Sequence, residues 1–289
     1  MFGNLLFKYF DYLSYFTVSF IIFCVNFFTF REIFNFNIYL IIFFSLLHLI
    51  GSIFFIKYYL KDTGSNFFFK NKAELINFFK NNHIELLLIL IVSIVSFWIA
   101  YSYYSYIENN NLFNLFYERT TVVALPSIFN GSKNLIASVI FSVSAILFYI
   151  FLRCTFISRF ISFLFSLYFC TSQTNLYNLI PSPLRDYAKA PIIFIFSIAI
   201  IYLIKNINKP KIEKLLIFLT ILSIFFGLWI RSDFLIFSFI FLVFLIYFLF
   251  VQNHKNKMLK YFQALGLLFF LCIPHIIYQL ILIGDNFAV

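Results

Sequence analysis

Long apolar runs, separated by short charged segments, recur along the whole sequence. Residues 234–251, FLIFSFIFLVFLIYFLFV, contain no charged side chain, and most of the other runs also lack one. A backbone surrounded by lipid must satisfy its N–H and C=O groups within the protein, as helices and closed barrels do. Barrel strands alternate in hydrophobicity with a period of two, and these runs do not. We therefore expect an all-α fold, a polytopic bundle of transmembrane helices.

The apolar runs predict about nine spans, some of them shorter than the ~20 residues usual for a transmembrane helix. One long span could cover residues 215–251, but two spans joined at residues 231–233 return the three lysines of residues 252–262 to the cytoplasm, so we expect two. The predicted spans are 13–30, 36–56, 86–107, 134–152, 158–172, 190–204, 215–230, 234–251 and 263–283.

The positions of the basic residues indicate the orientation of these spans. If the N-terminus is cytoplasmic and the sides alternate, 15 of the 21 lysines and arginines fall on the cytoplasmic side, as the positive-inside rule expects. The acidic residues divide almost evenly, so the whole formal net charge of +10 falls on the cytoplasmic face. This charge indicates topology and contact with anionic lipid headgroups, not binding to nucleic acid. The basic residues left outside are Arg31, Arg119, Lys133, Arg185, Lys189 and Arg231.

We expect one membrane domain over residues 1–289, an integral multi-pass protein of a bacterial inner (cell) membrane. Residues 1–85 supply an N-terminal hairpin and a cytoplasmic loop, in which NFFFKNKAELINFFKNN is either an amphipathic helix on the inner leaflet or a simple connection. Residues 86–251 form the core. Residues 252–289 hold the last span, and the chain is either a fragment or a minimal form.

Three polar segments share the predicted outer face. The loop 108–133 carries Glu108 and Glu118, and a second segment contains PSPLRDYAKAP, residues 181–191. In the latter, Ser182 and Pro183 are typical of a helix start, which places Arg185 and Lys189 four residues apart on one face. With Asp186 between them, these cations suit a phosphate group, or they only anchor a helix among lipid headgroups.

The third outer segment is the hairpin turn at residues 231–233. Arg231 and Asp233 interrupt a stretch that is otherwise apolar. Ionisable groups near membrane depth are costly, and they usually line a cavity or a substrate path. A structural pair that closes the hairpin is the alternative.

SPLRDYAKAP before a span and GLWIRSDFLIF one hairpin later resemble segments of integral-membrane glycosyltransferases of the GT-C type. The resemblance implies a polyprenyl-phosphate sugar as donor, transfer on the outer face, and an acidic residue of an outer loop as catalytic base. Because the first outer loop is only REIFN, the base would come from residues 108–133, with Glu118 as first choice and Glu108 as second. On this resemblance, Arg185, Lys189 and Arg231 are the candidates to bind the carrier phosphate, and Asp186 and Asp233 are further candidates to bind the substrate.

Two other functions remain open: a transporter or flippase of a lipid or small solute, and a non-catalytic subunit of a membrane assembly. Nucleotide-binding and soluble-hydrolase motifs are absent from the sequence. The four cysteines are scattered, and we expect them to pack as small apolar side chains within helices. We expect the side chains of His48 and His275 to be packed or hydrogen-bonded. No residues show metal-ligand spacing, and the need for a divalent metal stays open. Membrane lipids and the lipid-linked sugar are the expected partners.

Overall fold

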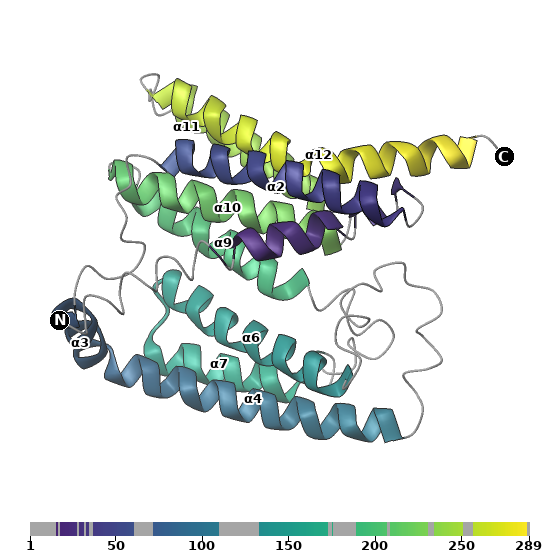
Figure 1. Cartoon of the computed structure of the whole chain (residues 1–289). Helices are drawn as coiled ribbons and strands as arrows, with labels where there is room; N and C mark the ends of the chain where they lie inside the picture. The colour runs from purple at the N-terminus through teal and green to yellow at the C-terminus, as the bar shows by residue number, and fades with distance from the viewer. Residues whose placement is uncertain are drawn as a thin grey trace. The chain divides into compact units, whose positions relative to one another are not determined.

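The computed structural model describes residues 16, 18–27, 29–31, 33–34, 37–60, 72–109, 133–172, 175, 189–206, 209–230, 234–250 and 257–287. Within these ranges the regular secondary structure is helical and no strand occurs, which confirms the all-α class (Figure 1). A first helical segment is Val18–Arg31. The helices that follow are α2 (Ile38–Leu60), α3 (Lys72–Asn81), α4 (His83–Asn109), α6 (Lys133–Cys154), α7 (Arg159–Thr171), α9 (Lys189–Lys205), α10 (Pro210–Ile230), α11 (Leu235–Phe250) and α12 (Met258–Phe287).

Each predicted span overlaps one of these helical segments. Residues 215–230 and 234–251 lie on the separate helices α10 and α11, as predicted from the lysines that follow them. The number of helices that cross the membrane remains a prediction. In the described residues, four segments are long and apolar enough to cross: Ile38–Leu60, His83–Tyr103, Ala137–Cys154 and Met258–Tyr278.

The helices expose many large apolar side chains, while several small polar side chains are buried between them. On α2, Ser45 and Ser52 are fully buried, whereas Phe43 and Phe54 are exposed. In water such large apolar faces would be covered, because exposed apolar patches of this size are rare on soluble monomers. The outer faces of these helices therefore suit lipid. The same arrangement recurs on α7, whose buried residues are Ser162, Ser166 and Cys170.

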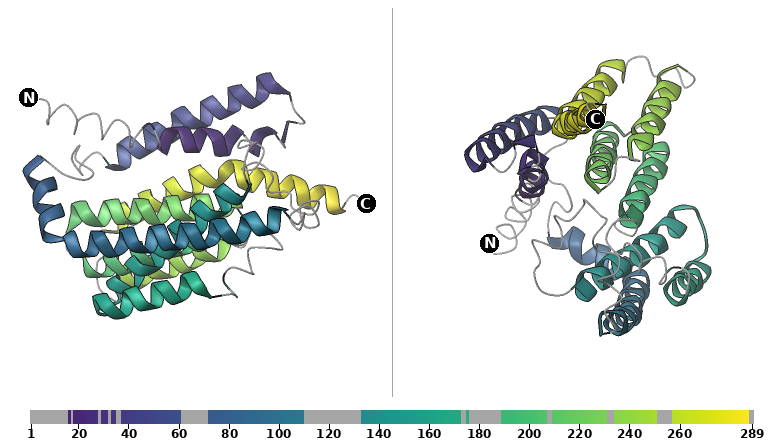
Figure 2. Two further views of the ribbon diagram at one scale, coloured as in Figure 1. Left: turned by 90° about the horizontal axis from the view of Figure 1, so that it is seen from below. Right: turned by 90° about the vertical axis from the view of Figure 1, so that its right-hand side faces the viewer.

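The chain divides into two compact units. Unit 1 comprises Met1–Ile76 and Asn206–Val289, and unit 2 comprises Asn77–Lys205. In unit 1, α12 packs against α10, α2 and α11. In unit 2, α6 is the central helix and contacts α4, α7 and α9; Figure 2 shows α4 in blue beside the teal helices.

Small residues allow α4 and α6 to pack closely in unit 2. Ala100 and Ala137 are buried in this interface. Ser142 donates a hydrogen bond to the carbonyl oxygen of Ser93, at 3.1 Å, and its Oγ lies 3.2 Å from Oγ of Ser96. Small side chains and hydroxyl groups that bond between helices are the usual means of association in a membrane, where lipid removes the hydrophobic drive between helices.

A glycine permits Phe234 to pack closely against α10 in unit 1. A Cβ atom added to Gly227 would lie 2.0 Å from Cδ1 of Phe234. The ring of Phe234 is buried, and it stacks on Phe237 with 4.9 Å between ring centroids. The aromatic ring thus occupies the space that any other residue at position 227 would fill.

Candidate functional site

Two of the outer residues predicted to act on a substrate lie on described helices of unit 2. Glu108 is the next-to-last residue of α4, and Lys189 is the first residue of α9. The other predicted site residues lie outside the described part of the chain: Glu118, Arg185, Asp186, Arg231 and Asp233.

Contacts at the other end of unit 2 fix the directions of these helices. Glu85, near the start of α4, pairs with Arg153, near the end of α6, so the two helices are antiparallel. Lys205, the last residue of α9, donates to the carbonyl oxygen of the last residue of α6 at 2.6 Å. The helices α6 and α9 therefore run in the same direction. It follows that Glu108 and Lys189 share one end of unit 2, and the Glu85 contacts occupy the opposite end.

The end of unit 2 that carries Glu85 is held by an ionic network. Oε1 of Glu85 accepts hydrogen bonds from Nε of Arg153 and from Nε of Arg159, both at 2.9 Å. The hydroxyl of Tyr149 donates to Oε2 of the same carboxylate. The side chain of Glu85 is 17% exposed, and two guanidinium groups compensate its charge.

Unit 1 has a comparable pair near the starts of α10 and α12. Glu213 is only 1% exposed, and its Oε2 lies 2.8 Å from Nζ of Lys257. The hydroxyl of Tyr261 donates to Oε1 at 3.2 Å. Each unit therefore gathers at one of its ends the charges that the positive-inside pattern assigned to the cytoplasm. The charge distribution in the sequence predicted a cytoplasmic position for the charged residues of these two clusters, but it did not predict which of them pair.

A proline in α12 explains the role of His48. Pro274 has no N–H to donate to the carbonyl oxygen of Phe270, four residues earlier. Nε2 of His48 lies 2.9 Å from that oxygen and supplies the missing hydrogen bond. This assigns the proton to Nε2, so Nδ1 accepts from the side-chain amide of Asn26, at 2.8 Å. The prediction of a hydrogen-bonded histidine is confirmed at this position.

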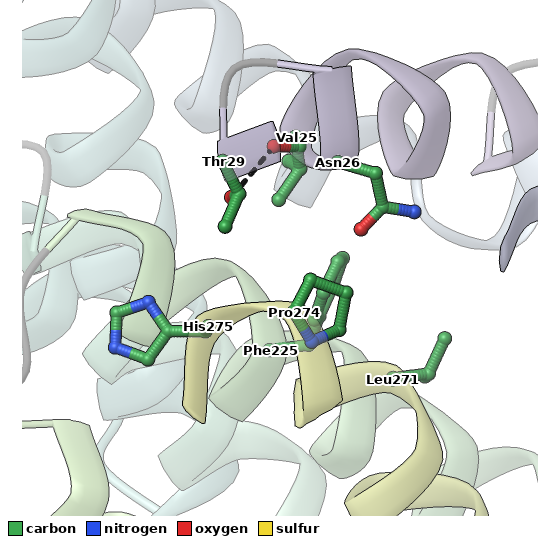
Figure 3. Close-up of a pocket in the computed structure, with 7 residues that line it drawn as sticks. All are labelled: Val25, Asn26, Thr29, Phe225, Leu271, Pro274 and His275. Atoms are coloured by element: carbon green, nitrogen blue, oxygen red, sulfur yellow. Dashed lines mark hydrogen bonds between the residues drawn. The ribbon is translucent and has the colours of Figure 1, made fainter. Parts of the chain in front are cut away.

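A small cavity with a mostly apolar lining lies near this proline, within unit 1 (Figure 3). Its volume is about 10 Å³, the room that one water molecule needs. Oδ1 of Asn26 and Nε2 of His275 are buried and have no hydrogen-bond partner among the described residues. Figure 3 shows the amide oxygen of Asn26 turned toward Pro274. The residues that line the cavity are Val25, Asn26, Thr29, Phe225, Leu271, Pro274 and His275.

Within the ranges that the structure describes, no three histidine, cysteine or acidic side chains gather where they could hold a metal ion. The cysteines are free, and Cys154, Cys170 and Cys272 are buried. Among the described groups, sequence patterns did not predict the ionic clusters or the cavity. The side chains that form them come from helices far apart in the sequence, so no local motif indicates them.

The predicted orientation has a direct test. We expect a membrane-impermeant maleimide to label Lys57→Cys only from the cytoplasmic side and Arg185→Cys only from the outer side. Right-side-out and inverted vesicles supply the two exposures, and the wild-type chain measures the background from its own cysteines. Labelling of both variants from the same side would contradict the orientation.

No protein-family model, curated protein or solved structure matches the chain.

Proposed function

We propose that this protein is a glycosyltransferase of a bacterial cell membrane. It moves a sugar from a polyprenyl-phosphate carrier to an acceptor on the outer face. SPLRDYAKAP and GLWIRSDFLIF support the proposal through their resemblance to the GT-C type. The structural observation in its favour is that α4 and α9 bring Glu108 and Lys189 to the same end of unit 2, away from the ionic network of Glu85.

The proposed chemistry needs one base and a group of cations. A carboxylate of the loop 108–133, from Glu118 or Glu108, takes the proton of an acceptor hydroxyl. The acceptor oxygen then bonds to the anomeric carbon of the sugar, and the bond from that carbon to the phosphate oxygen breaks. The carrier phosphate leaves with the electron pair. Arg185 and Lys189, with Arg231 as the resemblance implies, stabilise its charge.

The acidic residues at the ion-paired ends are poorly suited to act as this base. Glu85 already accepts hydrogen bonds from two arginines, and Glu213 is buried beside Lys257. The oxygens of both carboxylates already accept hydrogen bonds from these cations and from tyrosine hydroxyls, so neither is placed to take a proton from an acceptor. The base of a transferase is therefore expected among the outer acids, in agreement with the choice of Glu118 and Glu108.

The proposal is tested by sugar transfer in reconstituted vesicles. The full chain is supplied with radiolabelled polyprenyl-phosphate hexoses, and transfer to lipid or peptide acceptors is measured. We expect Glu118→Gln to lower the rate about 100-fold, because general-base catalysis contributes at least that factor. Arg185→Gln is also expected to lower the rate of transfer from the lipid-linked sugar, because Arg185 is proposed to bind the carrier phosphate.

A matched control is Glu74→Gln, which makes the same chemical change in the predicted cytoplasmic loop and is expected to leave transfer unchanged. Unchanged transfer in both Glu118→Gln and Glu108→Gln would remove the assigned base. Absence of transfer from every donor by the wild-type chain would contradict the proposal itself.

Passage of a small solute is a second candidate function, favoured by the buried polar atoms beside the cavity in unit 1. Polar side chains inside a membrane protein are costly to bury, and ionisable ones such as histidine often mark an ion or proton path. Oδ1 of Asn26 and Nε2 of His275 are the buried polar atoms without a partner among the described residues here. If Asn26→Leu and His275→Leu abolish uptake of a solute into vesicles while sugar transfer is absent, transport replaces transfer as the function.

A further inference from the structure

Three cations surround the short turn between α6 and α7 in unit 2. We call this group the basic corner: Arg153, Arg159 and Lys205. Arg153 donates from Nη1 to the carbonyl oxygen of Ile157, inside the turn. Lys205 donates to the carbonyl oxygen of Cys154 at the start of the turn. The three side chains come from the ends of three different elements and are brought together only by the packing of unit 2.

The basic corner has more positive charge than its neighbouring carboxylate compensates. Of the described acidic groups, Glu85 is the one that pairs here, with both arginines. Three cations against one carboxylate leave a net charge of +2. An excess of this size in a partly exposed position attracts an anion from outside the protein.

The corner also has hydrogen-bond donors to spare. Arg159 is 52% exposed, and its described contact uses only the Nε–H group, toward Glu85. The terminal nitrogens of its guanidinium make no hydrogen bond with the described residues, so a planar set of N–H groups on this half-exposed side chain is available to a ligand. Two such N–H groups match two oxygens of a phosphate. Arg159 is also the first residue of α7, whose N-terminal N–H groups favour negative charge.

An unusual residue completes the corner. Phe156 has a positive φ of 67°, a conformation that glycine usually supplies at the end of a helix and that is strained for an aromatic residue. Its side chain is 84% exposed, and Nζ of Lys205 lies 3.8 Å from the ring centroid. The ring thus holds the ammonium group of Lys205 and presents a large apolar surface next to it. The exposed side chain of Phe160, at 68%, extends this surface along α7.

We propose that the basic corner binds the phosphate of an anionic phospholipid. The headgroup phosphate contacts Arg159 and Lys205, and the acyl chains lie along the exposed rings of Phe156 and Phe160. The apolar surface beside the cations selects a lipid over a free phosphate ion, which gains nothing from it. Basic pockets at the membrane surface of helical bundles are known to suit anionic headgroups. This site lies at the opposite end of unit 2 from Glu108 and Lys189, so it is separate from the proposed transfer reaction.

The test is lipid binding by the purified full chain in a neutral detergent. Thermal unfolding is followed while phosphatidylglycerol, phosphatidylcholine or inorganic phosphate is added in separate series. We expect phosphatidylglycerol to raise the midpoint in a saturable way, since a ligand that binds the folded state stabilises it. Arg159→Gln and Lys205→Gln are each expected to weaken the apparent affinity about fivefold, and the double variant more.

The control variant is Lys209→Gln, which removes one exposed charge from unit 1 and is expected to retain the wild-type affinity. The midpoint of each variant without lipid shows whether it is folded, and retention of phosphatidylglycerol in native mass spectrometry measures binding independently of stability. Equal shifts with phosphatidylglycerol in Arg159→Gln, Lys205→Gln and the wild type would overturn the site. An equal shift with inorganic phosphate would show a simple anion site and contradict the lipid.

Discussion

Replacing Lys257 with methionine is expected to lower the free energy of unfolding by about 3–5 kcal/mol. Lys257 lies 2.8 Å from the carboxylate of Glu213, which is almost completely buried. Removal of one member of a buried ion pair leaves the other charge unpaired in the protein interior, where the dielectric constant is low. The loss exceeds that of a surface pair, which is rarely worth more than about 1 kcal/mol.

The measurement is unfolding in mixed micelles with increasing denaturing detergent. The variant Glu213→Met with Lys257→Met is expected to recover most of the loss, because apolar residues of similar volume can replace a buried pair at little cost. Lys209→Met is the control, since Lys209 is exposed. If Lys257→Met and Lys209→Met cause equally small losses of stability, the charge of Glu213 is not stabilised by Lys257.

The second large effect is expected at His48. The change His48→Leu leaves the carbonyl oxygen of Phe270 and the amide of Asn26 without their partner. We expect a loss of about 2–3 kcal/mol for the two buried groups together. Pro274 is the reason that the helix itself cannot compensate, because position 274 has no N–H.

A double-mutant cycle with Pro274→Ala tests this explanation. Alanine restores the N–H at position 274, so the carbonyl oxygen of Phe270 regains a partner within α12. The loss caused by His48→Leu is therefore expected to be smaller by about 1 kcal/mol in the Pro274→Ala background. His275→Leu is the matched control, because its buried Nε2 makes no described hydrogen bond to lose. Equal losses in both backgrounds would show that His48 does not act through Phe270.

The helices themselves could be predicted because each one depends on its own residues. An apolar run in lipid must form a helix to satisfy its backbone, so the run 234–251 predicts α11 without reference to any other part of the chain. The two-helix arrangement of residues 215–251 followed from the charges beyond it. The sequence shows Gly227 but not its role, because the ring of Phe234 that it accommodates lies beyond the end of α10, just before α11.

The candidate sites were predictable to a smaller extent. The outer residues were chosen from local sequence, and of these Glu108 and Lys189 proved to share one end of unit 2. Glu85 carried no such signal, because an acidic residue at a helix start is common and its arginines follow 68 and 74 positions later. Likewise, Pro274 suggested a broken hydrogen bond in α12, but not that a histidine 222 positions from Phe270 would repair it.

The sequence by itself determined the helical class and the positions of the helices, and it predicts an orientation from the excess of basic residues on one side. These features follow from the transfer of single segments into lipid and from the charge beside each segment. Only the tertiary structure decided which charges pair, which carbonyl His48 serves and where the basic corner forms. Each of those contacts joins side chains from different helices, and their distances are set by the packing of whole helices, not by any one of them.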